Sequence, residues 1–211
     1  MLKNTKDYLY NEYSIDESIC DLAERVEDDI KGEFVDIDKI KEYNQYKVLK
    51  AFQNNRVSDS HFTNSTGYGY GDIGRDTLDK VYADVFRCED ALVRPHIVSG
   101  THAIAVALFG NLRPSDTILS VTGTPYDTLE SIIGIEESPG SLKEYGVKYK
   151  QVDLLSDGGF DYENIKKNLL DDNTIRLIEI QRSTGYGWRP SLTLDKIKEV
   201  ISFIKSIRSD A

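Results

Sequence analysis

The chain has 211 residues, of which 39% are hydrophobic and 29% charged, as is typical of a globular protein with one domain of ordinary size or slightly more. Its formal net charge of −10 argues against binding of nucleic-acid phosphates, which needs a clustered basic face. No apolar run is long enough to cross a bilayer and residues 1–10 are too polar for a signal peptide, so we expect a cytoplasmic protein without a membrane partner.

The first part of the chain carries two amphipathic helical patterns. Ser14 followed by Glu17 forms a capping pattern, after which apolar residues recur at helical spacing until Gly32 ends the run. A second helix is expected from near Asp36 to Phe52. Because neither helix can bury its apolar stripe alone, residues 1–57 are predicted to form a helical N-terminal arm that packs on something larger.

Residues 53–74 are polar and punctuated by glycine, which predicts a long ordered loop. A helix is expected after Asp76, where apolar residues recur up to Phe86. Long loops inside compact domains are usually functional, so this loop is a candidate part of a binding site.

Strand and helix patterns then alternate through the second part of the chain, residues 58–211. Short β-prone runs occupy residues 91–93, 117–121, 147–152 and 175–180, and helical patterns occupy residues 101–109, 125–133, 162–170 and 194–207. This alternation predicts an α/β fold with a mostly parallel sheet and helices on both faces. In such sheets ligands bind beyond the carboxyl ends of the strands.

The G-x-G-x-x-G pattern at residues 69–74 is found in dinucleotide-binding folds. A true fingerprint follows an apolar strand, whereas the residues before this one are polar. The other interpretation is a Gly/Tyr turn, which leaves the side chains of Tyr68, Tyr70, Asp72 and Arg75 unexplained.

A small-residue turn, Ser99-Gly100-Thr101-His102, lies between an apolar run and an apolar helix. Free backbone N–H groups and the positive end of a helix dipole converge at such a turn, which favours a phosphate. An ordinary strand-to-helix turn capped by Ser99 or Thr101 fits the residue types equally well. His96 and His102 lack further ligands at metal spacing, and the two cysteines lack histidine partners, so no metal site is expected.

Two further loops follow predicted strands and should meet this turn at one edge of the sheet. The first carries Tyr126, which could lie against a planar ligand or simply fill the loop. The second, residues 181–190, carries Arg182, Arg189 and Trp188, the only tryptophan. Two arginines there favour recognition of a carboxylate or phosphate, and a solvated loop is the alternative.

These signals coincide in five ordered segments, NSTGYGYGDIGRDTLDKVYADVF, ALVRPHIVSGTHAIAVALFGNLRP, VTGTPYDTLE, GSLKEYGV and IQRSTGYGWRPSL. From about Asp59 onward the sequence resembles the fold-type-I pyridoxal-phosphate (PLP) enzymes of cysteine and methionine metabolism. It is most similar to their aluminium-resistance branch, which is methionine gamma-lyase-like and cystathionine beta-lyase-like.

The resemblance implies that pyridoxal 5'-phosphate is the cofactor. It implies that Ser99, Gly100, Thr101 and His102 hold the cofactor phosphate and that Tyr126 stacks on the pyridine ring. It also implies a homodimer or homotetramer, in which upstream groups reach the phosphate of the neighbouring subunit. Tyr70 stands at the matching distance before Gly100. Asp72 occupies the place where the wider family has arginine, and Arg75 could substitute for it from one helical turn further on. Tyr68, Arg182 and Arg189 are candidate contacts for an amino-acid substrate.

The family continues with a strand that bears an aspartate for the pyridinium nitrogen and later with the Schiff-base lysine. Neither is found here, so we expect an N-terminal fragment of a PLP-dependent carbon–sulfur lyase that acts on sulfur-containing amino acids. No catalytic residue is assigned to this chain, which is expected to be inactive alone. A non-catalytic binding or assembly partner is the alternative function, and a dinucleotide-binding oxidoreductase is a third.

Overall fold

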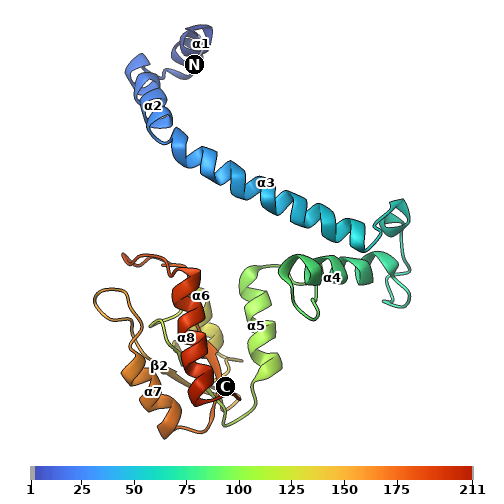
Figure 1. Ribbon diagram of the computed structural model, residues 1–211, viewed down its shortest axis with the longest axis vertical. Helices are drawn as coiled ribbons and strands as arrows, with labels where there is room; N and C mark the ends of the chain where they lie inside the picture. Colours follow the sequence, from blue (N-terminus) through green and yellow to red (C-terminus); the bar gives the residue numbers. More distant parts are fainter. Residues whose placement is uncertain (1–2, 211) are drawn as a thin grey trace. The chain divides into compact units, whose positions relative to one another are not determined.

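A computed structural model describes residues 3–210, which fall into two compact units. The first unit ends at Arg94 and the second begins at Pro95. Figure 1 shows the elements of both units along the chain. The predicted domain boundary between residues 57 and 58 is not tested by this division and stays a prediction.

The first unit is helical (Figure 1). Its elements are α1 (Lys3–Tyr13), α2 (Glu17–Asp29), α3 (Lys31–Asn54), the 3-10 helix η1 (Asp59–Phe62) and α4 (Ile73–Phe86). The helical N-terminal arm is therefore confirmed, and α1 is a helix that the sequence pattern did not predict.

The boundaries of α2 and α3 differ from those predicted. The N-cap of α2 is Asp16, whose carboxylate accepts a hydrogen bond from the Ser18 N–H at 2.9 Å, so the predicted cap at Ser14 is wrong. Gly32 does not end a helix, because the chain turns at Ile30 and Gly32 lies in the first turn of α3. An acidic side chain at the positive end of a helix is favourable, which explains the choice of Asp16.

Apolar side chains along α2 and α3 remain exposed. Ile40 in the middle of α3 is 63% exposed, whereas Ala51 near its end is buried, as is Val81 on α4. The last turn of α3 is tied to α4 by a hydrogen bond of 2.8 Å from Asn55 to Asp84. As predicted, neither long helix buries its stripe alone.

The segment between α3 and α4 is mostly irregular, as predicted, apart from η1. Helix α4 begins at Ile73, earlier than expected, because the Asp72 carboxylate caps it by accepting the Arg75 N–H at 3.0 Å. The predicted strand at residues 91–93 is wrong. These described residues join no sheet, and the N–H of Val93 instead donates to Asp79 at 2.8 Å.

The second unit alternates helices with a small parallel sheet. Its elements are α5 (Gly100–Asn111), β1 (Thr117–Ser120), α6 (Asp127–Ile133), β2 (Lys148–Gln151), α7 (Tyr162–Asp171), β3 (Ile175–Glu179) and α8 (Leu194–Ile207). The strand order is β2-β1-β3 and both pairings are parallel. The other three predicted strands and the four predicted helices are confirmed within one or two residues of their bounds.

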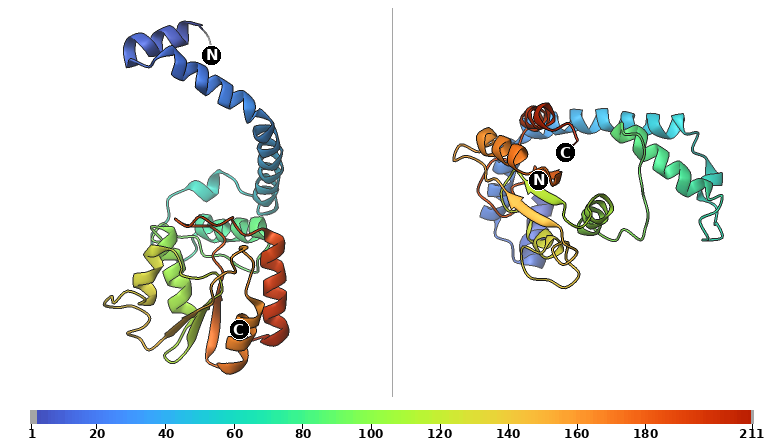
Figure 2. Two further views of the ribbon diagram at one scale, coloured as in Figure 1. Left: turned by 90° about the vertical axis from the view of Figure 1, so that its left-hand side faces the viewer. Right: turned by 90° about the horizontal axis from the view of Figure 1, so that it is seen from below.

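The central strand β1 is buried on both faces, and successive residues point to opposite sides. Ile118 packs with buried residues of α5 and α6, whereas Leu119 packs with those of α7 and α8. The right-hand view of Figure 2 shows the sheet between these two pairs of helices. The predicted α/β fold with helices on both faces is confirmed.

Parallel pairing places the carboxyl ends of all three strands at one edge of the sheet. Ser120 pairs in register with Gln151 of β2 and Glu179 of β3, so these polar residues form a row across that edge. The segments that follow each strand begin beside this row, at the position where α/β sheets bind ligands.

We predict that Ile165 of α7, which is fully buried, carries a large share of the second unit's stability. Ile165→Ala should lower the free energy of unfolding by about 2–5 kcal/mol, because it removes buried methylene groups and leaves a cavity. Ile201→Ala on α8, where the side chain is 45% exposed, should cost less than about 1 kcal/mol. Urea denaturation of both variants measures the difference, and equal losses would contradict the described core.

Candidate functional site

The turn at Ser99 forms the amino end of α5. Ser99 has an extended backbone, and its hydroxyl accepts the His102 N–H at 3.0 Å, while its carbonyl accepts the Ala103 N–H at 3.1 Å. Among the described residues, these bonds leave the N–H groups of Gly100 and Thr101 without an acceptor. Ser99 therefore caps the helix, and two backbone donors stay available at the positive end of its dipole.

Gly100 leaves open space above this turn. A Cβ built at Gly100 would meet no described atom within 4 Å, so packing within the chain does not explain the glycine. The His102 imidazole lies 3.4 Å from the Val98 N–H, which places its ring against the preceding backbone. An anion can therefore approach the N–H groups of Gly100 and Thr101 directly.

A side-chain contact joins this turn to the start of α6. The hydroxyl groups of Thr101 and Thr128 lie 3.0 Å apart. Thr128 is two residues beyond Tyr126, the N-cap residue of α6. The structure thus brings the predicted phosphate-binding turn and the predicted ring-stacking tyrosine to neighbouring helix ends of one unit.

Tyr126 is held in place by Gln181, which follows β3. The Tyr126 N–H donates to the Gln181 side-chain oxygen at 2.7 Å, and the Gln181 N–H donates to the Thr122 hydroxyl at 3.0 Å. Gln181 was not among the site residues predicted from the sequence. Its place just after a predicted strand at the ligand-binding edge is the signal that could have indicated it.

The ring of Tyr126 is stacked on that of Tyr186, with centroids 5.6 Å apart and an angle of 24° between the planes. Their hydroxyl groups lie 3.1 Å apart, and this hydrogen bond raises the pKa of Tyr126. Both rings line a hollow of about 550 Å³, together with Trp188 and Arg189. Because Tyr186 is 81% exposed, a planar ligand can replace its ring against the face of Tyr126.

The two arginines of the loop after β3 brace the loop itself. The Arg189 guanidinium donates to the carbonyl oxygens of Gln181 and Ser183 at 2.9 and 2.8 Å, and Arg182 Nε donates to the Leu192 carbonyl at 3.2 Å. Arg189 borders the hollow, whereas Arg182 is not among its lining residues. Substrate binding by either arginine stays a prediction.

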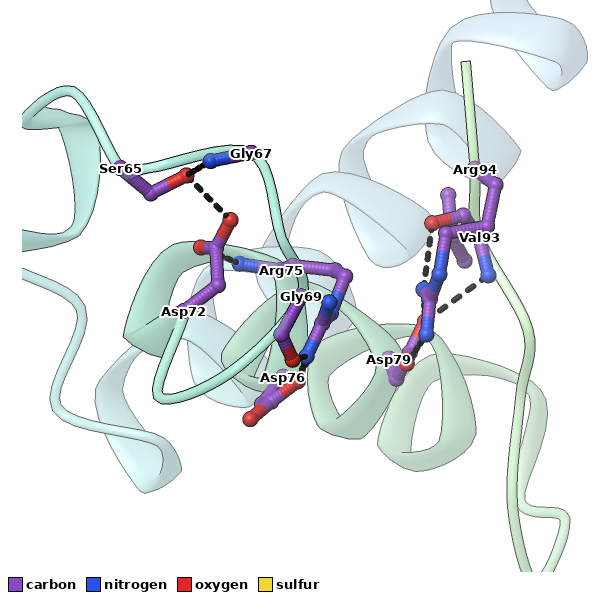
Figure 3. Close-up of polar contacts among 9 residues, drawn as sticks. All are labelled: Ser65, Gly67, Gly69, Asp72, Arg75, Asp76, Asp79, Val93 and Arg94. Carbon is purple, nitrogen blue, oxygen red and sulfur yellow. Dashed lines mark hydrogen bonds and ion pairs between the residues drawn. The ribbon is translucent and has the colours of Figure 1, made fainter. Parts of the chain in front are cut away.

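The loop before α4, in the first unit, holds the remaining predicted site residues, and Figure 3 shows the contacts of two residues at its end, Asp72 and Arg75. The Arg75 guanidinium donates to the Gly69 carbonyl at 2.6 Å and to Asp76 at 2.8 Å. Asp72 accepts the Ser65 hydroxyl at 2.8 Å in addition to capping α4, and these bonds lower its pKa. Tyr68 and Tyr70 project from the loop with exposed fractions of 83% and 89%.

The glycine pattern of this loop has a local packing explanation. A Cβ at Gly69 would lie 2.7 Å from Arg75 Nη1, and one at Gly74 would collide with the His61 carbonyl. The 3-10 helix η1 precedes the pattern, where a dinucleotide-binding fold has a strand. The structure therefore gives no support to a dinucleotide site here.

Within residues 3–210, no group of three or more His, Cys, Asp and Glu side chains is placed to hold a metal ion. Of the helices in that range, none combines the length and apolarity that a membrane crossing requires.

Comparison with known proteins gives a consistent result. Residues 19–211 match the model of the family described as methionine gamma-lyase. A carbon–sulfur lyase involved in aluminium resistance from Clostridium novyi NT is 55% identical in sequence, with a TM-score of 0.93 over 100% of this chain and 50% of that chain. A Clostridium acetobutylicum protein, provisionally identified as a cystathionine beta-lyase involved in aluminium resistance, is 56% identical, with a TM-score of 0.94 and the same coverage.

A curated relative is the uncharacterised protein YnbB of Bacillus subtilis, which is 51% identical over 190 residues, or 89% of this chain and 45% of YnbB. The chain thus spans about half the length of the relatives that it matches.

Proposed function

The chain belongs to the methionine gamma-lyase family, and on that premise we propose that it supplies the phosphate-binding and ring-stacking part of the site of a PLP-dependent carbon–sulfur lyase. The substrate class would be sulfur-containing amino acids. The observation that carries the proposal is the open turn at Gly100, with two unpaired backbone donors beside the loop of Tyr126.

The residues present fit this cofactor. Its phosphate is an anion, and the amino end of α5 offers the N–H groups of Gly100 and Thr101 and the Thr101 hydroxyl at a site where no Cβ obstructs approach. Its ring is planar and aromatic, and Tyr126 offers a ring face that now contacts another ring. When bound, PLP supplies an electron sink for carbanion formation at the amino-acid Cα.

The chain's own residues then have three tasks. Gly100 and Thr101 hold the phosphate and fix one end of the cofactor. Tyr126 covers the ring, and Gln181 fixes Tyr126 by accepting its backbone N–H. The exposed side chains of Tyr186 and Trp188, at 81% and 104%, would close over the bound ring and exclude water.

The proposal extends to assembly as a homodimer or homotetramer. Tyr70 and Arg75 would reach the phosphate bound by a second copy of the chain. Support comes from the exposure of Tyr70, and from the length of its loop, because long loops inside compact domains are usually functional. Arg75 would have to exchange its hydrogen bond to the Gly69 carbonyl for one to the phosphate.

The first test is Gly100→Val, because a branched side chain at this position would fill the space that the phosphate needs. Binding of PLP should weaken at least about tenfold, as expected for loss of charge-assisted hydrogen bonds. The matched control is Gly110→Val in the same helix, where a Cβ also meets no described atom within 4 Å. Equilibrium dialysis against PLP gives both dissociation constants, and equal values would place the phosphate site elsewhere.

The second test concerns Tyr126. Tyr126→Phe should keep most of the affinity for PLP, because stacking depends on the ring and not on the hydroxyl. Tyr126→Ala should weaken binding by about 1 kcal/mol or more, which corresponds to roughly fivefold or more. Quenching of the fluorescence of Trp188 by PLP provides the titration. If Phe and Ala weaken binding equally, the hydroxyl makes the contact and the stacking role is wrong.

The third test asks whether Tyr70 acts across a subunit boundary. Tyr70→Ala and Gly100→Val chains should each bind PLP weakly alone. If Tyr70 serves the partner's site, mixed dimers recover one intact site each, because one chain supplies Gly100 and the other Tyr70. Dialysis after co-refolding of the two variants measures the recovery, and its absence in proven mixed dimers would assign Tyr70 to its own chain's site.

A further inference from the structure

Three oxygen atoms meet at the carboxyl edge of the sheet, behind the loop that carries Tyr126. Ser120, the last residue of β1, is fully buried. Its Oγ lies 2.6 Å from the Gly123 carbonyl oxygen and 2.6 Å from Glu179 Oε2. Glu179 ends β3 and pairs in register with Ser120.

These two contacts require two protons. The Ser120 hydroxyl carries one proton and can donate it to only one acceptor. The Gly123 carbonyl has no proton to donate, so it must receive that of Ser120. The second contact then needs a proton on the Glu179 carboxyl group, because two oxygens with only lone pairs between them would repel each other at 2.6 Å.

The burial of Glu179 agrees with this proton count. Burial is the largest influence and raises the pKa of Glu179, whereas the hydrogen bond with Ser120 and the charge of Arg189 oppose the rise. Arg189 donates instead to the Gln181 and Ser183 carbonyls. From β2, Tyr149 faces the same cluster. Its own burial, with a smaller contribution from Glu179, raises its pKa to about 12 against a hydrogen bond with Ser120, so the Tyr149 hydroxyl stays neutral. Asp153 and Glu130 act on Tyr149 in the same direction.

We infer that Glu179 is held as the neutral carboxylic acid and is a positioning residue, which fixes Ser120 and through it the loop that carries Tyr126. Glu179 donates to Ser120, and Ser120 donates to the Gly123 carbonyl. The Gly123 N–H donates to the Val152 carbonyl at 3.1 Å, so both the N–H and the carbonyl of Gly123 are hydrogen-bonded. Tyr126 follows three residues later.

Loss of the Glu179 proton would break this chain of hydrogen bonds. The Ser120 hydroxyl would then donate to the Glu179 carboxylate, which is the stronger acceptor, and its hydrogen bond to the Gly123 carbonyl would be lost. The sign of the pH effect follows from the raised pKa. The stabilisation from Glu179 is complete below the ordinary pKa of 4.5 and is lost as the pH rises through the raised value.

Carbon-13 NMR of the chain labelled at glutamate carboxyl groups tests the inference without any cofactor. Glu179→Gln identifies the Glu179 resonance, and Glu137→Gln identifies that of an exposed glutamate as the matched control. The Glu179 resonance should titrate at a higher pH than the Glu137 resonance. Titration at the same or a lower pH would overturn the inference. If Glu179→Gln does not fold, through-bond assignment in the unsubstituted chain gives the same comparison.

Thermal unfolding between pH 5 and pH 9 gives a second readout. Glu179→Gln keeps a neutral donor to Ser120. Its unfolding midpoint, relative to that of the unsubstituted chain, should therefore rise as the pH rises. The midpoint of Glu137→Gln should change with pH as that of the unsubstituted chain does. If the unfolding midpoints of the unsubstituted chain, Glu179→Gln and Glu137→Gln all change with pH in the same way, the inference is wrong.

One consequence rests on the proposed function, namely that the protonation of Glu179 affects PLP binding through the position of Tyr126. PLP should bind Glu179→Gln with an affinity that falls less at alkaline pH than that of the unsubstituted chain. If PLP binds neither form, the proposed function fails, whereas the NMR titration and the unfolding curves still decide the state of Glu179. If both forms bind PLP with the same pH dependence, Glu179 does not position Tyr126.

Discussion

The parallel pairing of β1 with β2 and β3 is the constraint on which the second unit depends. A parallel sheet of this kind needs apolar cover on both faces, and β1 accordingly alternates its buried side chains between the pair α5 and α6 and the pair α7 and α8. The same pairing brings three strand ends to one edge. Tyr126, Gln181 and the Ser120–Glu179 contact therefore lie close together although 59 positions separate Ser120 from Glu179.

The sequence predicts the elements of this unit well, because strand and helix patterns alternate without long interruptions. Helix α8 has the predicted bounds, and the strands fall inside the predicted runs. The run at residues 91–93 is apolar enough for a strand, yet its backbone bonds to Asp79 and no neighbouring strand is present among the described residues. Periodicity shows which residues are apolar, whereas strand pairing depends on the rest of the fold.

The candidate site is predicted only in part for a similar reason. Ser99, Gly100 and Tyr126 have residue types that suggest a role, and their places at helix starts can be read from the sequence. Gln181, Thr128 and Glu179 act through contacts between segments far apart in the chain. The sequence shows that Arg182 and Arg189 are cations in a loop, but not that their hydrogen bonds go to that loop's own carbonyls. The resemblance to a family assigned roles to Ser99, Gly100 and Tyr126, whereas their residue types alone also fit an ordinary helix cap and a loop-filling tyrosine.

The central claim is that PLP phosphate binds the amino end of α5. The most direct measurement is the change of backbone amide resonances in a nitrogen-15-labelled chain during titration with PLP, with inorganic phosphate as a second ligand. The account predicts that the amide signals of Gly100 and Thr101 shift most with both ligands, and that signals near Tyr126 shift only with PLP. Unchanged Gly100 and Thr101 amides, with saturable shifts in another part of the chain, would contradict it.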